Sequence, residues 1–147
     1  MGLFDNVFSD MSPKEQFSKA DAFAGILLSA VACDGHISDE EVQGLGTIAS
    51  RMKLFENING QKWNRMIDRL LGILKRDGVE KLLEVSTKYL PEELHDTAFA
   101  AACDLVLADQ GIEDEEKQYL SNLQKKLGLD REMALKIFKV MVVKNRG

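Results

Sequence analysis

Hydrophobic residues recur at intervals of three and four positions along most of the chain, the spacing that places them on one face of an α-helix. No segment sustains the period-2 alternation of a β-strand. Small residues in the first long stretch, Ala24, Gly25 and Ala30, predict that a neighbouring helix approaches it closely. With prolines, glycines and capping boxes as boundaries, the first five predicted helices are Ser12 to Gly35, Ser38 to Met52, Trp63 to Asp77, Val79 to Leu90 and Pro91 to Val106. A sixth helix follows the second acidic turn, carries Leu120, Leu123 and Leu127 and ends at Gly128, and the seventh extends from Asp130 to Met141. We therefore expect an all-α protein, a compact bundle of about seven helices.

The N-terminal residues carry a short apolar stripe of their own. Phe4, Val7, Phe8 and Met11 stand at i, i+3, i+4 and i+7, one face of a short helix. Such a stripe packs on the core of its own domain or lies on a membrane or a partner, and the pattern leaves both open. We accordingly divide the chain into an amphipathic segment, residues 1–11, and a single helical domain, residues 12–147.

Two acidic stretches of the chain resemble each other, ACDGHISDEE (32–41) and ADQGIEDEE (108–116). A shift of 75 positions places Asp34 on Asp109, Ile37 on Ile112, Asp39 on Asp114, Glu40 on Glu115 and Glu41 on Glu116. A long helix, an acidic turn and a second amphipathic helix thus occur in each half, residues 12–76 and 77–147. We expect an internal repeat with approximate two-fold symmetry.

The first acidic stretch has the spacing of the second half of an EF-hand calcium loop. Such a loop needs oxygen ligands at positions 1, 3 and 5, glycine at 6 and glutamate at 12. With Gly35 at position 6, Asp34 is position 5 and Glu41 position 12, but Ala30 and Ala32 occupy positions 1 and 3. The second stretch has leucine at both of these positions. Neither stretch is therefore a complete loop by itself.

Two half-sets of ligands can make one site if the two turns meet. Converging carboxylates are costly unless a hard cation bridges them, so calcium or magnesium is the first expectation for an all-oxygen site. The predicted metal ligands are Asp34, Glu41, Asp109 and Glu116, and the predicted partner-binding acidic patch is Asp39, Glu40, Asp114 and Glu115.

The same acids also fit an ordinary structural role. Acids in the first turn of a helix stabilise it by roughly 0.3–1 kcal/mol each, through the exposed amides and the helix dipole. Asp34 and Asp109 can accept turn hydrogen bonds, and Glu41 and Glu116 can complete capping boxes. The recurrence of Asp and Glu at a seven-residue interval in both halves is what favours a metal.

Composition narrows the class of protein. At 147 residues the chain is the size of one domain that buries its core without disulfides. A formal charge of -5, with basic residues dispersed among acids, argues against nucleic acid as a partner. Cys33 and Cys103 form no CxxC motif and fit buried thiols in a reducing compartment. Without a signal peptide or an apolar run of about 18 residues, we expect a cytoplasmic protein.

The paired motif A-x-D-G-x-I-x-x-x-E, set between amphipathic helices in an acidic helical domain, resembles the TerB (tellurite-resistance) family over roughly Gln16 to Lys144. The residues that carry it are Ala32, Asp34, Gly35, Ile37 and Glu41, then Leu107, Asp109, Ile112 and Glu116. The resemblance implies a pseudo-symmetric helical domain with a cation-binding acidic patch. It also implies a role in a bacterial stress system, together with a membrane protein of that system; no catalytic activity is established for the family.

The function we predict is a non-enzymatic, divalent-cation-binding and protein-interaction domain. The alternative is a purely structural adaptor that docks a membrane protein or a partner helix, with acidic turns that serve only as helix caps. Its contact surfaces would be Leu3 to Met11 or the apolar run Ile137 to Val143, and they would contact a partner helix or the inner face of a membrane. For the last helix we expect a core-facing side made of Met133, Ile137, Phe138 and Met141, and burial is favoured for Val140 to Val143 as well. An enzyme is not expected, because HExxH, GxSxG and phosphate-binding glycine loops are missing from the sequence. Nothing in the sequence indicates the oligomeric state.

Overall fold

Every regular element is helical in the part of the chain that the structure, a computed structural model, describes, residues 17–108 and 112–146. The α-helices are α2 (Lys19–Ala32), α3 (Asp39–Ser50), α4 (Gly60–Asp77), α5 (Val79–Tyr89), α6 (His95–Leu107), α7 (Asp114–Leu127) and α8 (Arg131–Lys144). Short 3-10 helices, η1 (Lys53–Phe55) and η2 (Glu92–Leu94), precede α4 and α6. The predicted all-α class is confirmed.

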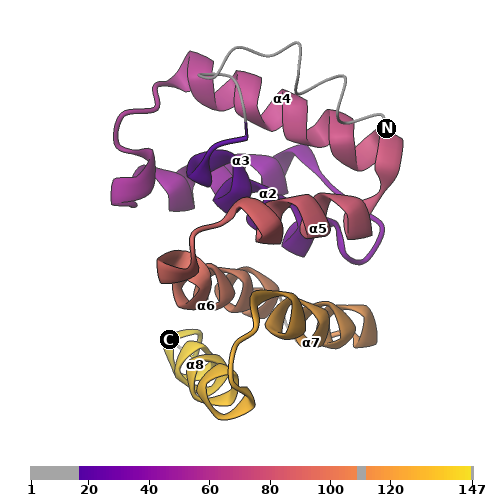
Figure 1. Cartoon of the computed structure of the whole chain (residues 1–147), viewed down its shortest axis with the longest axis vertical. Coiled ribbons are helices and arrows are strands. Elements are labelled where there is room, and N and C mark those ends of the chain that lie inside the picture. Colours follow the sequence, from indigo (N-terminus) through magenta and orange to yellow (C-terminus); the bar gives the residue numbers. More distant parts are fainter. Residues whose placement is uncertain (1–16, 109–111, 147) are drawn as a thin grey trace.

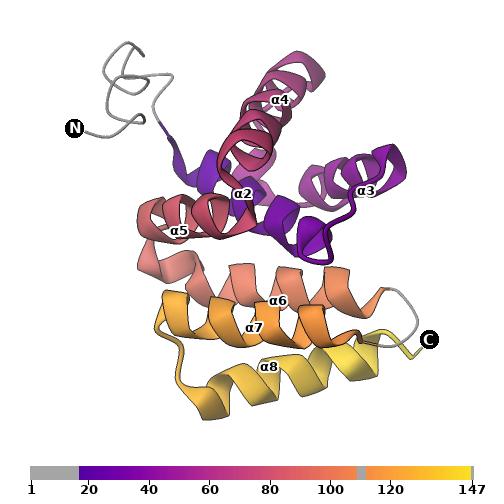
Figure 2. The same ribbon diagram turned by 90° about the vertical axis from the view of Figure 1, so that its right-hand side faces the viewer.

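The helices form two groups that meet along α2 and α6. In Figure 1, α2, α3, α4 and α5 occupy the upper part of the molecule, and α6, α7 and α8 the lower part. Turned by 90°, α6, α7 and α8 lie beneath one another, with α2 and α5 above α6 (Figure 2). α2 packs most extensively on α5 and then on α6, and α8 packs mainly on α6. One continuous hydrophobic core runs through both groups.

α2 is the central helix and is buried on nearly all sides from Ala20 to Ala32. Gly25 lets α5 approach it, because a Cβ at this position would lie 2.0 Å from Ser86 Oγ and 3.2 Å from Ser86 Cβ. The close approach predicted for this stretch of small residues is therefore present, and α5 is the helix that makes it.

α2 begins later than the sequence predicted. The expected start at Ser12 lies outside the described residues, and the helix begins at Lys19, after the extended residue Ser18. Ser18 Oγ accepts a hydrogen bond from the Asp21 amide, and the Asp21 carboxylate accepts one from the Ser18 amide. The buried Asp21 also pairs with Arg69 of α4. This capping box is the physical reason for the start, and the prediction of one helix from Ser12 to Gly35 is wrong at its N-terminal end.

Glycines end two of the helices where the sequence predicted. Gly78 follows α4 with φ of 91°, and Gly128 follows α7 with φ of 67°, conformations that glycine adopts without a steric penalty. α2 ends at Ala32, three residues before Gly35.

Helix boundaries in the two halves keep the same offset. α2 ends at Ala32 and α6 at Leu107, while α3 begins at Asp39 and α7 at Asp114, so both pairs are 75 positions apart. A common origin of the halves and a two-fold axis between them stay predictions.

α8 is less buried than its sequence suggests. Ile137, Phe138 and Met141 pack against the core as predicted, but Met133, expected on the same face, is 44% exposed. Val140 and Val143, for which a buried core helix was the favoured reading, are 60% and 59% exposed. The reason is position, since α8 lies at the edge of the bundle and rests mainly on α6. Within the described ranges no helix is long and apolar enough to cross a membrane.

Candidate functional site

The first acidic turn connects α2 to α3, and its carboxylates bond to the turn itself. The exposed Asp34 accepts a hydrogen bond from the His36 amide at 2.9 Å. Glu41 accepts from the amide and the hydroxyl of Ser38 at 3.1 and 3.0 Å, and Ser38 Oγ accepts from the Glu41 amide. The predicted capping box at Ser38 is present, and it engages the carboxylate that was also proposed as a metal ligand.

The second acidic turn shows the same arrangement where it is described. Glu116, in the first turn of α7, accepts a hydrogen bond from the Glu113 amide at 2.8 Å. Asp109, the fourth predicted ligand, lies outside the described residues. The acids of the predicted partner-binding patch are exposed in the first turns of α3 and α7: Asp39, Glu40, Asp114 and Glu115.

The two turns act electrostatically on one thiol. The pKa of Cys33, at the end of α2, is raised to about 11 by burial first and then by the carboxylates of Glu116, Asp34 and Glu115, against a backbone hydrogen bond that lowers it. Carboxylates of the α2–α3 turn and of α7 therefore lie within electrostatic range of the same group. Glu41 does not contribute to this shift. Among the described side chains, no three His, Cys, Asp or Glu converge closely enough to hold a metal ion.

A buried polar contact joins α7 to α2, and its α7 residue, Tyr119, lies about one helical turn after Glu116. The Tyr119 hydroxyl donates to the Ile26 carbonyl at 2.9 Å and lies 2.8 Å from Ser29 Oγ. Ser29 Oγ donates to the same carbonyl at 2.7 Å. Burial raises the pKa of Tyr119 well above its ordinary value. This contact fixes the beginning of α7, with its acids, against the end of α2.

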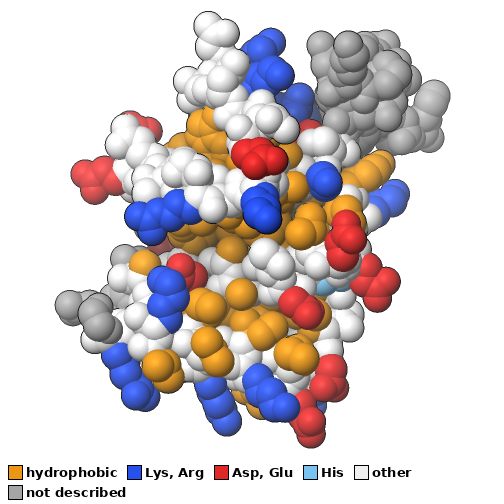
Figure 3. Space-filling model, turned by 90° about the vertical axis from the view of Figure 1, so that its left-hand side faces the viewer, with side chains coloured by type: hydrophobic (Ala, Val, Ile, Leu, Met, Phe, Trp, Pro, Cys, Tyr) orange, Lys and Arg blue, Asp and Glu red, His pale blue; other side chains and the backbone are white. Residues whose placement is uncertain are grey.

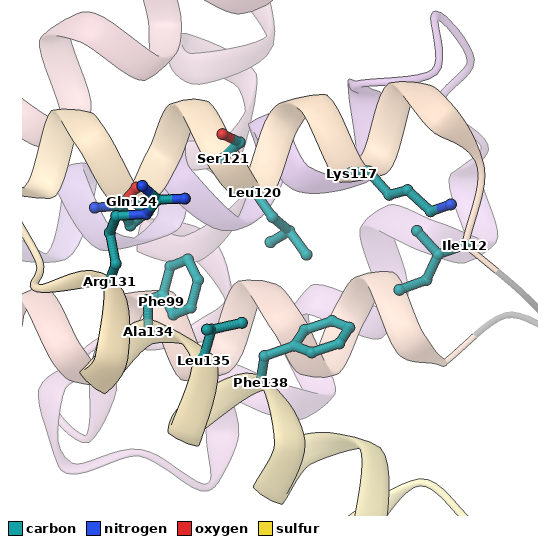
Figure 4. Close-up of a pocket in the computed structure, with 10 residues that line it drawn as sticks. All are labelled: Phe99, Ile112, Lys117, Leu120, Ser121, Gln124, Arg131, Ala134, Leu135 and Phe138. Atoms are coloured by element: carbon teal, nitrogen blue, oxygen red, sulfur yellow. The ribbon is translucent and has the colours of Figure 1, made fainter.

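A cavity of about 400 Å³, which we call the α7–α8 groove, opens on the other side of α7. Its base is apolar and buried, with Phe99, Leu120 and Ala134 only 4%, 7% and 7% exposed. Leu135 stands at its rim and is 57% exposed. The side chains of α7 and α8 face each other across the space (Figure 4). The full lining is Phe99, Ile112, Lys117, Leu120, Ser121, Gln124, Arg131, Ala134, Leu135 and Phe138.

The opposite flank of α8 has a second, smaller hollow of about 310 Å³ against α6. Met133, Ile137 and Val140 contribute to it, together with Lys136. In the space-filling view, hydrophobic patches and basic side chains adjoin along the lower part of the molecule (Figure 3). Apolar surface is therefore open on both sides of α8.

The sequence interpretation missed the α7–α8 groove. It placed the candidate metal ligands at the acidic turns, and its alternative contact surface Ile137 to Val143 shares only Phe138 with the lining of the groove. One signal was available, because Leu135, Val140 and Val143 lie off the helical face that Ile137 and Phe138 define. A helix with more apolar positions than one face can bury exposes some of them.

Comparison with protein-family models, with curated proteins and with solved structures finds no match to this chain. The resemblance to TerB proteins therefore rests on the motif residues of the two acidic stretches.

Proposed function

We propose that this protein is a non-enzymatic protein-interaction domain whose α7–α8 groove docks a partner. The observation that carries the proposal is an open apolar cavity of about 400 Å³ with Leu135 exposed at its rim. Concave apolar sites with a few polar groups are the usual places where proteins bind ligands and partner segments. The capping-box hydrogen bonds of Glu41 and Glu116 support the adaptor form of this function, in which the acids of the turns cap helices.

The biological setting we propose follows the resemblance of the motif residues to TerB proteins. In that setting the domain is a bacterial, cytoplasmic stress-response protein connected with tellurite resistance. Its partners are other proteins, including a membrane protein of the same system, and nucleic acid is not among them. The acidic surface and the dispersed basic residues support this choice of partners.

The test compares two variants of one helix. Leu135→Glu places a charge at the rim of the groove, whereas Val143→Glu places the same charge at an equally exposed position of α8 that does not line it. We expect at least one protein that co-purifies from the native cells with wild type and with Val143→Glu to be lost with Leu135→Glu. If Leu135→Glu retains every such protein while keeping its helical circular dichroism, the groove is not an interaction site.

A second candidate function is binding of a divalent cation at the paired acidic turns. It is favoured by the equivalent positions of the two acidic turns, one between α2 and α3 and the other between α6 and α7, and by Glu116, Asp34 and Glu115 all acting to raise the pKa of the Cys33 thiol. A calcium or magnesium ion held by carboxylates of both turns would oppose this field. The proposed ligands are Asp34, Glu41, Asp109 and Glu116.

Alkylation of Cys33 by iodoacetamide reports on such a cation. A bound cation lowers the pKa of the thiol, and at a fixed pH below that pKa each unit increases the thiolate fraction about tenfold. The rate rises by a smaller factor, because a thiolate of lower pKa is a weaker nucleophile. We expect calcium or magnesium chloride to accelerate modification of Cys33, followed by peptide mass spectrometry, relative to sodium chloride of equal ionic strength. The acceleration should saturate and should be reduced in Glu116→Gln. Equal rates in all salts, with no thermal shift by either cation, would reject the site.

A further inference from the structure

The α7–α8 groove is built from two facing rows of side chains. On each helix the lining positions follow the spacing i, i+3, i+4 and i+7, so each row extends over two helical turns, about 10 Å. A partner helix with apolar anchors at i, i+4 and i+7 presents side chains over the same length. The rows are Lys117, Leu120, Ser121 and Gln124 on α7, and Arg131, Ala134, Leu135 and Phe138 on α8.

A basic side chain stands at each end of the groove. Figure 4 shows Lys117 beside Ile112 at one end and Arg131 beside Gln124 at the other. Arg131 is exposed and has no hydrogen bond or ion pair with another residue in the described ranges. Lys117 Nζ lies 4.0 Å from Asp114 Oδ1, and both side chains are largely exposed, so this pair holds Lys117 only weakly. Both cations are therefore available to a partner.

Both charged side chains that line the groove are basic, Lys117 and Arg131, although the formal charge of the chain is -5. The acids in the first turn of α7 adjoin the Lys117 end but do not line the groove. A second copy seated through its own α8 would bring Lys136 and Lys139 of that helix to a groove whose charged lining residues are both basic, which opposes self-association through α8. Charge complementarity therefore favours an acidic occupant.

A membrane surface fits this face less well than a helix. The apolar base of the groove is recessed between α7 and α8. On the outer face of α8, Glu132 and Lys139 lie between the exposed Leu135 and Val140 in helical projection. A helix that lies in a bilayer interface instead presents one continuous, protruding apolar face.

We propose that the α7–α8 groove binds an amphipathic helix of a partner protein, with two or three apolar anchors across about two turns and acidic residues at both ends that pair with Lys117 and Arg131. This inference rests on the proposed function as an interaction domain and names the chemistry of the partner.

Two matched panels of synthetic helical peptides test it with the full chain by fluorescence anisotropy. Both carry the same combinations of Leu, Ile and Phe at i, i+4 and i+7, but one has Glu at both ends and the other Lys. We expect members of the Glu panel alone to bind wild type. The double variant Lys117→Glu/Arg131→Glu should lose at least about tenfold in affinity for them and should bind the Lys panel instead.

The control variant Lys126→Glu/Lys139→Glu makes the same change in net charge on α7 and α8 outside the groove. It should retain most of the affinity for the Glu panel, since only a diffuse field is altered. Equal binding of both panels to wild type, or equal losses in the two double variants, overturns the inference.

Two further results would overturn it in different ways. Phosphatidylglycerol vesicles that bind wild type but not Leu135→Glu, and that displace the peptides, would identify a membrane as the occupant. If no peptide of either panel binds while Leu135→Glu still loses its cellular partners, the acidic-helix inference fails and the interaction function stands. If Leu135→Glu retains all its partners as well, both fail.

Discussion

Gly25 is the residue at which one missing methyl group determines how closely α2 and α5 pack. We expect Gly25→Ala to destabilise the fold by about 1–3 kcal/mol, because overpacking of a close helix contact outweighs the better helix propensity of alanine. The added Cβ would lie 2.0 Å from Ser86 Oγ. Urea unfolding followed by circular dichroism measures the change.

Two controls separate this clash from a general effect of alanine. Gly72 of α4 has nothing within 4 Å of its Cβ direction, so Gly72→Ala should stabilise by up to about 1 kcal/mol. Ser86 Oγ is buried and makes no hydrogen bond with a described residue, so Ser86→Ala should cost little and should rescue part of the loss in the double variant. Equal effects at Gly25 and Gly72 would contradict the close approach.

At the scale of elements, His95 connects the ends of two helices. Its Nδ1 lies 2.9 Å from the Leu127 carbonyl oxygen at the end of α7, and its Nε2 lies 3.0 Å from the Leu90 carbonyl oxygen after α5. Both oxygens accept, so both bonds exist together only in the protonated ring. We expect His95→Ala to cost about 1–3 kcal/mol in urea unfolding, because partly buried carbonyls lose their donors.

His36 is the matched control, since it is the other histidine of the chain and is exposed in the first acidic turn. Its amide, rather than its ring, bonds to Asp34, so His36→Ala should change stability by no more than about 0.5 kcal/mol. Similar losses in the two variants would mean that the His95 ring does not join α5 to α7.

Elements could be predicted where their determinants are local. The S-x-x-E box at Ser38 and the stops at Gly78 and Gly128 depend on residues within one turn, and the structure has them. The start of α2 was misplaced because the capping pair of Ser18 and Asp21, a box with aspartate in place of glutamate, was not recognised.

In the candidate site, too, the locally determined features could be predicted from the sequence and those that depend on helix packing could not. The capping role of Glu41 and Glu116 depends on residues three positions away and was among the alternatives. The α7–α8 groove depends on how α7 and α8 pack above Phe99 of α6, which periodicity along a single chain does not reveal. The one sign of the groove in the sequence is that α8 has more apolar positions than a single helical face can bury.

At the scale of the whole molecule, three titratable groups link stability to alkaline pH. The pKa of Cys33 is raised from 9.0 to about 11, and that of Cys103 from 9.0 to about 12. The pKa of Tyr119 is raised as well, and burial is the largest cause for all three groups. Each group is neutral when protonated, so the folded state keeps its proton to a higher pH than the unfolded state. The resulting stability is complete below pH 9.0 and is lost as the pH rises towards the folded pKa values.

The variant Tyr119→Phe isolates the contribution of this phenol to the pH dependence of stability. The Tyr119 hydroxyl also joins α7 to α2, so the variant has an effect at neutral pH as well. At neutral pH we expect Tyr119→Phe to lose about 1 kcal/mol, since the bond to Ile26 disappears while Ser29 still donates to the same carbonyl. Above pH 10 its urea midpoint should fall less steeply with pH than that of wild type, because phenylalanine has no proton to lose. Tyr89→Phe is the control: it makes the same chemical change at a tyrosine that is 44% exposed, and its urea midpoint should fall with pH as steeply as that of wild type. Parallel slopes for wild type and Tyr119→Phe would show that the buried phenol does not contribute to the alkaline loss of stability.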